Sequence, residues 1–481
     1  MSQALTRLKW AAASCTAALG GLALMPEPAA AHGLVGRADL PIPAWLFGWA
    51  AALVLLVSFV ALATLWKDPQ LEADDDFRPL PEWLSFPLVN PVTEAFAALA
   101  GVALLALIVW SGLAGVQTPQ ENFAPTFIYV LFWVGLVPLS IAFGDLFRAF
   151  NPWRAIGRAA GFVASRTKGR TRTPFRYPAW LGRWPAAVGL LGFAWIELAY
   201  SNGDDPSTLA IAALVYTAIT LIAIACFGTQ AWISRGEAFS VYFNLFSRLS
   251  PLTTREGRLG LRRPLSGIAA LEPLPGTVAL LVVMIGNVMF DGASEGKPWV
   301  DVAPDIQDFF VDLGFSLGTS LELTFSVGMM IALAIVTTVY TIGVAGVRAI
   351  DHRPTVSVTR KFVHSLVPIA AVYVLAHYFS LLAYNGQAIA SLSSDPLGKG
   401  WDLFGTAGST IDYGIVGATA IWYVQVGTLV AGHVCGLLLS HDRALVLYGK
   451  ARAATTSQYC MLAVMVAFTT FGLFLLSQAN R

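Results

Sequence analysis

The sequence predicts an all-α polytopic membrane protein, a bundle of about ten transmembrane helices. First, 56% of its 481 residues are hydrophobic and only 12% are charged, whereas soluble domains carry about 25% charged residues. Second, apolar windows of about 20 residues, the length that crosses a bilayer, recur along the whole chain. Third, basic and acidic loops alternate between these windows. Together these observations exclude a single soluble domain carrying one membrane anchor.

The N-terminus has the three parts of a secretory signal. Arg7 and Lys9 precede an apolar run over residues 10–24, and the small residues Ala29-Ala30-Ala31 follow. This order is typical of a signal peptide, and the run is too short to span a bilayer about 30 Å thick. We therefore expect residues 1–31 to be removed, leaving residues 32–481 as one transmembrane helical domain whose N-terminus, His32, lies outside.

The spans follow from hydropathy alone. The segment 237–251 is different, because it is amphipathic and aromatic, and it predicts a helix lying in the membrane interface. The basic segment 235–271 around it would divide the domain into halves, 32–235 and 271–481. The predicted spans are residues 45–66, 94–114, 126–144, 185–201, 208–233, 277–290, 317–347, 362–382, 411–440 and 459–477.

Loop charges set the orientation. Four loops rich in Arg and Lys are each separated from the next by two spans, and the loops between them are acidic or neutral. Basic loops stay in the cytoplasm, so the predicted location is the bacterial inner membrane. The loop 67–91 departs from the pattern because it is acidic. Since topology explains the basic loops, we expect no nucleic-acid partner; the bilayer and a small-molecule substrate are the expected partners. The basic loops are residues 154–183, 235–263, 348–361 and 443–452.

Ionisable side chains inside spans are costly and mark functional sites. Asp291, Glu322, His377 and Asp412 come from four spans and are all expected in the outer half of the bilayer. Carboxylates with a histidine can hold a divalent metal ion that activates water. The sequence therefore predicts a metal site of these four residues, with Glu322 and His377 as the catalytic groups. The alternative is that the acids simply meet water at the interface.

Two histidines are expected nearer the cytoplasm. His364 begins one span, and His433 lies near the end of another, within a Gly-xxx-Gly pattern that allows close helix approach. They could meet across a helix pair and bind haem or copper, or each could be a packing residue. The following His441-Asp442-Arg443 has the composition of a solvated helix end. In residues 144–155, the aromatic and arginine residues predict an interfacial anchor.

Three stretches carry a family resemblance. They are HGLVGRADLPIPAWLFGWAAALVLLVSFVAL (residues 32–62), FNPWRA (150–155) and VQVGTLVAGHVCGLLLSHDRAL (424–445). Across its length the chain resembles bacterial membrane proteins labelled fenitrothion hydrolase, a membrane-bound organophosphorus hydrolase. The resemblance implies a polytopic fold and hydrolysis of phosphotriesters.

Three functions stay open from the sequence. The first is a metal-assisted hydrolase of organophosphorus triesters, which rests on the resemblance. The second is a transporter or permease of metal ions or protons, which would use the same acids and both histidine levels. The third is a redox subunit that binds haem or copper through His364 and His433.

Overall fold

The computed structural model describes residues 44–72, 77–167, 174–348 and 355–479. These residues form a helical bundle with one small sheet, in agreement with the predicted all-α class. The predicted signal peptide, residues 1–31, and His32 lie outside the described residues. Within the described residues, eight helices are long and apolar enough to cross a membrane. They are Leu46–Leu65, Glu82–Ala114, Phe123–Phe143, Pro206–Phe227, Thr277–Ser294, Leu317–Val347, Val358–His377 and Ala418–Tyr448.

Two further helices correspond to the remaining predicted spans. The pair α22 (Ala451–Ser457) and α23 (Tyr459–Ala479) is bent by 42° and counts as a ninth candidate. Helix α9 (Trp184–Leu198) is apolar but has only 15 residues. Every predicted window therefore overlaps a helix. The window 411–440 is displaced, because helix α21 runs over Ala418–Tyr448.

The outer helices present apolar side chains to their surroundings. On α2 (Ala44–Leu65), Leu53, Leu56 and Val57 are 61%, 50% and 58% exposed. A row of exposed leucine and valine is unfavourable in water but not in lipid. By contrast, 72% of the best apolar window of Thr277–Ser294 is buried. The bundle thus has lipid-suited outer helices and a buried centre.

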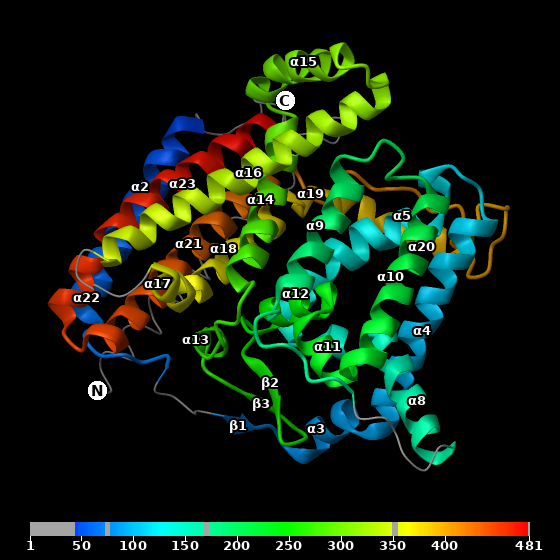
Figure 1. Ribbon diagram of the computed structural model, residues 1–481, viewed down its shortest axis with the longest axis horizontal. Helices are drawn as coiled ribbons and strands as arrows, with labels where there is room; N and C mark the ends of the chain where they lie inside the picture. The colour runs from blue at the N-terminus through cyan, green and yellow to red at the C-terminus, as the bar shows by residue number, and fades with distance from the viewer. Residues whose placement is uncertain (1–43, 73–76, 168–173, 349–354, 480–481) are drawn as a thin grey trace.

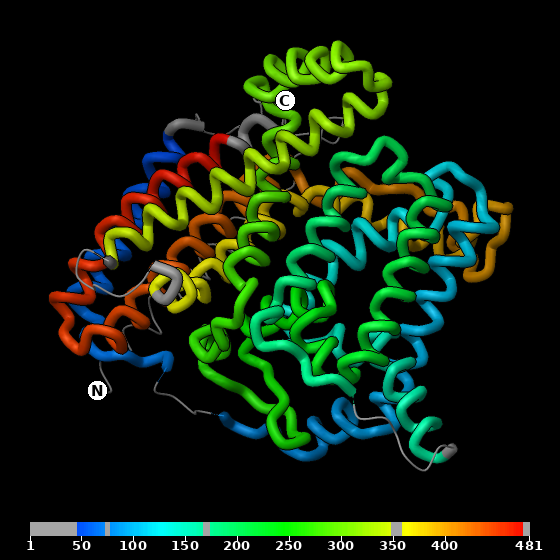
Figure 2. Tube along the Cα trace, in the orientation of Figure 1, coloured from blue at the N-terminus to red at the C-terminus, as the bar shows by residue number. Residues whose placement is uncertain are grey.

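The first and last described helices lie side by side. Helix α2 packs along α23 and α21 at one end of the molecule (Figures 1 and 2). One buried hydrophobic cluster runs from Phe47 on α2 to Leu473 on α23 and draws residues from both predicted halves. The other long helices are α4 (Pro91–Ala114), α10 (Pro206–Phe227), α14 (Thr277–Ser294) and α16 (Leu317–Arg348).

The remaining elements are short. Strands β1 and β2 both pair antiparallel with β3, which lies between them. The strands are β1 (Arg78–Pro79), β2 (Leu252–Arg255) and β3 (Arg258–Leu261). The short helices include α3 (Glu82–Val89), α5 (Phe123–Pro125), α13 (Ser266–Ala269), α15 (Lys297–Asp312), α17 (Thr355–Phe362) and α20 (Ile389–Ser394).

Two stretches of chain fold back into the bundle by the same design. In each, a helical segment long enough to span a membrane ends at a glycine with φ near +87°, a short helix follows, and a buried polar residue caps the next helix. Glycine adopts this backbone conformation without strain. The first stretch is α6 (Leu136–Phe143), Gly144, α7 (Leu146–Phe150), Asn151 and α8 (Pro152–Thr167). The second is α10, Gly228, α11 (Thr229–Arg235), Glu237 and α12 (Ala238–Ser247).

The two turns meet inside the bundle, where Glu237 is fully buried. The Asn151 amide donates to Glu237 Oε2 at 3.2 Å and to Ser240 Oγ at 2.7 Å. The carboxylate also accepts hydrogen bonds from the Tyr216 hydroxyl and from the backbone N–H groups of Phe239 and Ser240. Tyr216 lies near the middle of α10, so this turn lies deep in the bundle. The N-termini of α8 and α12 both carry partial positive charge, which stabilises a carboxylate between them.

Helix α12 is therefore not the predicted interfacial helix. Nine of its ten residues are buried, and it packs against α6, α7 and α9. The prediction was wrong because an aromatic amphipathic segment was interpreted as a membrane-surface helix. At the far end of α12, Arg262 donates to the carbonyl oxygens of Ser247 and Ser250 at 2.7 and 2.9 Å. Burial lowers the pKa of Arg262 to about 10, so it remains charged at neutral pH.

The end of α21 is also buried rather than solvated as predicted. His441 and Asp442 are each 1% exposed. The Asp442 carboxylate accepts hydrogen bonds from Trp66 Nε1 and from the backbone N–H groups of Gln70 and Leu71. Its neighbour Arg443 forms an ion pair with Glu72. The sequence His-Asp-Arg thus anchors the chain that leaves α2.

The close approach of Gly101 on α4 to the Asn151 turn gives a test of this packing. A Cβ at Gly101 would lie 1.7 Å from the Phe150 carbonyl oxygen, whereas one at Gly192 would meet nothing within 4 Å. We expect Gly101→Ala to cost about 1–3 kcal/mol through overpacking. The matched change Gly192→Ala should be neutral or slightly stabilising, because alanine favours a helix. Thermal unfolding of both variants in detergent measures the difference; equal midpoints would contradict this packing.

Candidate functional site

A compact group of ionisable and polar side chains is centred on Asp291, near the end of α14. Its Oδ2 atom lies 2.9 Å from His377 Nε2 and accepts a hydrogen bond of 2.6 Å from the Tyr378 hydroxyl. Both residues sit where α18 (Leu366–His377) ends and α19 (Phe379–Tyr384) begins. A break in a helix thus directs two consecutive side chains at one carboxylate.

The three residues are largely shielded from solvent but not all fully buried. The side chains of His377 and Asp291 are 17% and 24% exposed, and Tyr378 is buried. An imidazole N–H that donates to a carboxylate is held in one orientation and can carry a proton. Close by, Glu295 caps the end of α14, and burial together with the negative charge of Asp291 raises the pKa of Glu295.

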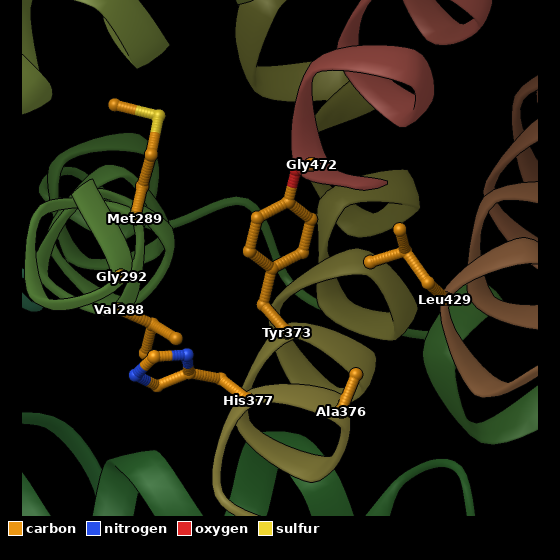
Figure 3. A pocket seen from close by; sticks show the side chains of 8 residues that line it. All are labelled: Val288, Met289, Gly292, Tyr373, Ala376, His377, Leu429 and Gly472. Carbon is orange, nitrogen blue, oxygen red and sulfur yellow. The ribbon is translucent and has the colours of Figure 1, made fainter. Parts of the chain in front are cut away.

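His377 also lines a small cavity. Its volume is about 20 Å³, and α14, α18, α21 and α23 all line it. That space holds about one water molecule. In Figure 3, the His377 ring points toward Val288 and Gly292, and the Tyr373 ring crosses toward Gly472. A Cβ at Gly292 would lie 3.3 Å from the ring, so glycine permits this close contact.

The four predicted metal ligands do not gather in one place. His377 and Asp291 are hydrogen-bonded, but Glu322 accepts hydrogen bonds from the backbone and hydroxyl of Ser201. Asp412 is exposed and accepts from the Gly414 N–H in the loop before α21. Over residues 44–72, 77–167, 174–348 and 355–479, no group of three His, Cys, Asp or Glu could hold a metal ion. The prediction failed because similar depth in the bilayer does not fix which face of a helix a residue occupies.

The two inner histidines are both buried, at 2% exposed for His364 and 0% for His433, but they lie at different heights. The His433 ring lies among Tyr373 and Phe468, and its Nδ1 bonds the Leu429 carbonyl of its own helix. His364 instead precedes Ser365, whose carbonyl oxygen approaches Gly436 of α21, and both of its ring nitrogens are buried without a hydrogen bond. This arrangement does not place a haem or copper between them.

An aromatic wall continues inward from the Asp291 group. Tyr242 on α12 stacks on Trp133 with ring centroids 4.6 Å apart, and Trp133 packs on Phe193 of α9 at 4.9 Å. Trp133 belongs to a π-helical run, Thr126–Gly135, a rare conformation that is frequent at functional sites. Glu197 is one turn beyond Phe193 on the same face of α9.

Sequence reasoning placed Asp291 and His377 correctly in one region but missed their third partner and the wall. Tyr378 directly follows His377, so its position was a usable signal. Tyr242 was not recognised as a site residue because its helix was predicted to lie at the membrane surface. Trp133 was not recognised because it is one of 15 tryptophans, and nothing in the sequence distinguishes it from the others.

Comparison of the chain with protein-family models, with curated proteins and with solved structures gives no match.

A double-mutant cycle tests the contact at the centre of this site. His377→Gln and Asp291→Asn should each destabilise the protein, and the double variant should lose less than the sum. We expect a coupling energy of about 2 kcal/mol, because hydrogen-bonded partners couple and distant residues add. The control cycle of His377→Gln with Asp412→Asn should show no coupling. Unfolding free energies in detergent provide the measurement, and additivity in both cycles would refute the pairing.

Proposed function

We propose that this chain is a membrane permease that moves protons, alone or with a cation, and that the His377–Asp291–Tyr378 group carries the proton. The observation that supports this proposal most is the hydrogen-bonded histidine and carboxylate in the interior of a bundle of apolar helices. Ionisable groups in that position are expensive and mark proton or ion pathways. Histidine changes its charge near neutral pH, which suits a reversible proton carrier.

The helix break at the site supports the same proposal. Helix α18 ends at His377, and the chain continues as α19, a 3₁₀ turn over Asn385–Ala388 and α20. Transporters commonly bind their cargo where a transmembrane helix is interrupted, because the interruption frees backbone groups and allows movement. The inward turns at Asn151 and Glu237 add irregular backbone that is buried in protein, the one place where a membrane tolerates it.

A hydrolase would use the same residues differently. His377, oriented by Asp291, could act as a general base toward water in the cavity beside its ring. That cavity, about 20 Å³, accommodates a water molecule but not a phosphotriester, and the described residues supply no metal-binding group. The hydrolase stays a prediction from the family resemblance, whereas the permease needs only the groups that are in contact.

Proton flux in vesicles tests the permease. Purified protein in liposomes containing a pH-sensitive dye would be given a potassium diffusion potential, with and without external sodium, zinc or manganese. We expect faster internal acidification than in protein-free liposomes under at least one of these conditions. His377→Gln and Asp291→Asn should reduce that rate about tenfold or more, because each removes a group that carries the proton.

The control variant is Glu322→Gln, a carboxylate on α16 outside the hydrogen-bonded group, which should keep the wild-type rate. Rates equal to those of protein-free liposomes under every condition would reject the proposal. So would full activity in His377→Gln.

A further inference from the structure

Several polar groups in the centre of the bundle have no partner. The Tyr242 hydroxyl and both polar atoms of the Asn287 amide are buried without a hydrogen bond in the described structure. Their residues are 0% and 3% exposed. The Glu197 carboxylate, on a residue that is only half-buried, also forms no hydrogen bond or ion pair with any described residue. Buried polar groups are almost always satisfied, so the unpaired atoms of Tyr242 and Asn287 require a partner.

These groups converge on one region. The stacked rings of Tyr242 and Trp133 and the packing of Trp133 on Phe193 bring α12 against the face of α9 that carries Glu197. Asn287 is one turn before Asp291 on α14, on the same face, and α14 packs against both α9 and α18. Three helices, α9, α12 and α14, therefore carry unpartnered oxygen atoms, and α18 packs against both α12 and α14.

The charges in this space determine what could fill it. Asp291 already has a partner in His377, and a protonated imidazole would balance its charge. When it is ionised, Glu197 supplies one unbalanced negative charge, and the other polar atoms, on Tyr242 and Asn287, are neutral. One net negative charge among neutral oxygens suits a monovalent cation better than a divalent ion.

We propose that the space between α9, α12, α14 and α18 is a binding site for a monovalent cation, with Glu197 as its counter-ion and Tyr242 and Asn287 as neutral oxygen ligands. The shared chemistry is a single positive charge, carried by an alkali metal ion or by a small ammonium group. The site lies directly inward of the His377–Asp291 group. The claim that this cation is the cargo of the permease depends on the proposed function. The claim that the cation binds here does not.

Binding to the purified protein in detergent tests the site without requiring flux. Thermal unfolding would be followed with sodium chloride or methylammonium chloride, at constant ionic strength made up with N-methylglucamine chloride. A ligand that binds the folded state raises the unfolding midpoint with concentration. We expect saturable stabilisation by at least one of the two cations: sodium alone would identify an alkali ion site, and methylammonium would identify an ammonium site.

Variants locate the cation. Glu197→Gln keeps size and removes charge, and it should raise the dissociation constant about tenfold or more, as expected for loss of a charged partner. Tyr242→Phe keeps the ring stacked on Trp133 and removes only the hydroxyl, so it should fold normally and bind more weakly. Glu322→Gln is the matched control and should bind as the wild type does.

The outcomes separate this inference from the permease. Absence of stabilisation by either cation, unchanged binding in Glu197→Gln, or stabilisation by calcium or zinc but by no monovalent ion would overturn the site. Cation binding without proton flux in vesicles would keep the site and reject the permease. Proton flux without cation binding would keep the permease and reject the cation site.

Discussion

The buried carboxylate of Glu237 holds the interior of this bundle in place. It receives hydrogen bonds from the side chains of Asn151 and Tyr216 and from two backbone N–H groups at the start of α12. Those partners belong to α10, to α12 and to the turn before α8, so a single group joins three parts of the chain. Breaking such a network costs more than a single hydrogen bond, because the remaining buried groups are left unsatisfied.

The position of α12 links this network to the candidate site. With its N-terminus held at Glu237 and its C-terminal carbonyls bound by Arg262, α12 lies inside the bundle and places Tyr242 on Trp133. Without those two anchors, a segment as aromatic and amphipathic as residues 237–251 would lie at a membrane surface, as its sequence suggests. The site is thus built from tertiary hydrogen bonds as much as from hydropathy.

Hydropathy predicted the helices well, because apolar windows depend on composition within a short stretch of chain. The overlap of every predicted span with a helix reflects this, as does the buried centre formed by α14 and α18. Contacts between spans were harder to predict. Asp291 and His377 were predicted at one depth in the bilayer, and they are in contact. Glu322 and Asp412 were predicted at the same depth but do not contact them, because the rotation of each helix about its axis depends on packing that the sequence does not display. Asp442 illustrates the same limit, since its three donors come from residues 66–71, at the opposite end of the chain.

The central claim is that a monovalent cation binds between Glu197, Tyr242 and Asn287, next to the His377–Asp291 pair. An experimental structure of the protein in lipid, at a resolution that shows ordered water, tests it most directly. We expect density for a cation bonded to the Tyr242 hydroxyl, the Asn287 amide oxygen and the Glu197 carboxylate, with His377 still on Asp291. A water molecule in that position, or direct pairing of these side chains with one another and with other protein groups, would contradict the claim.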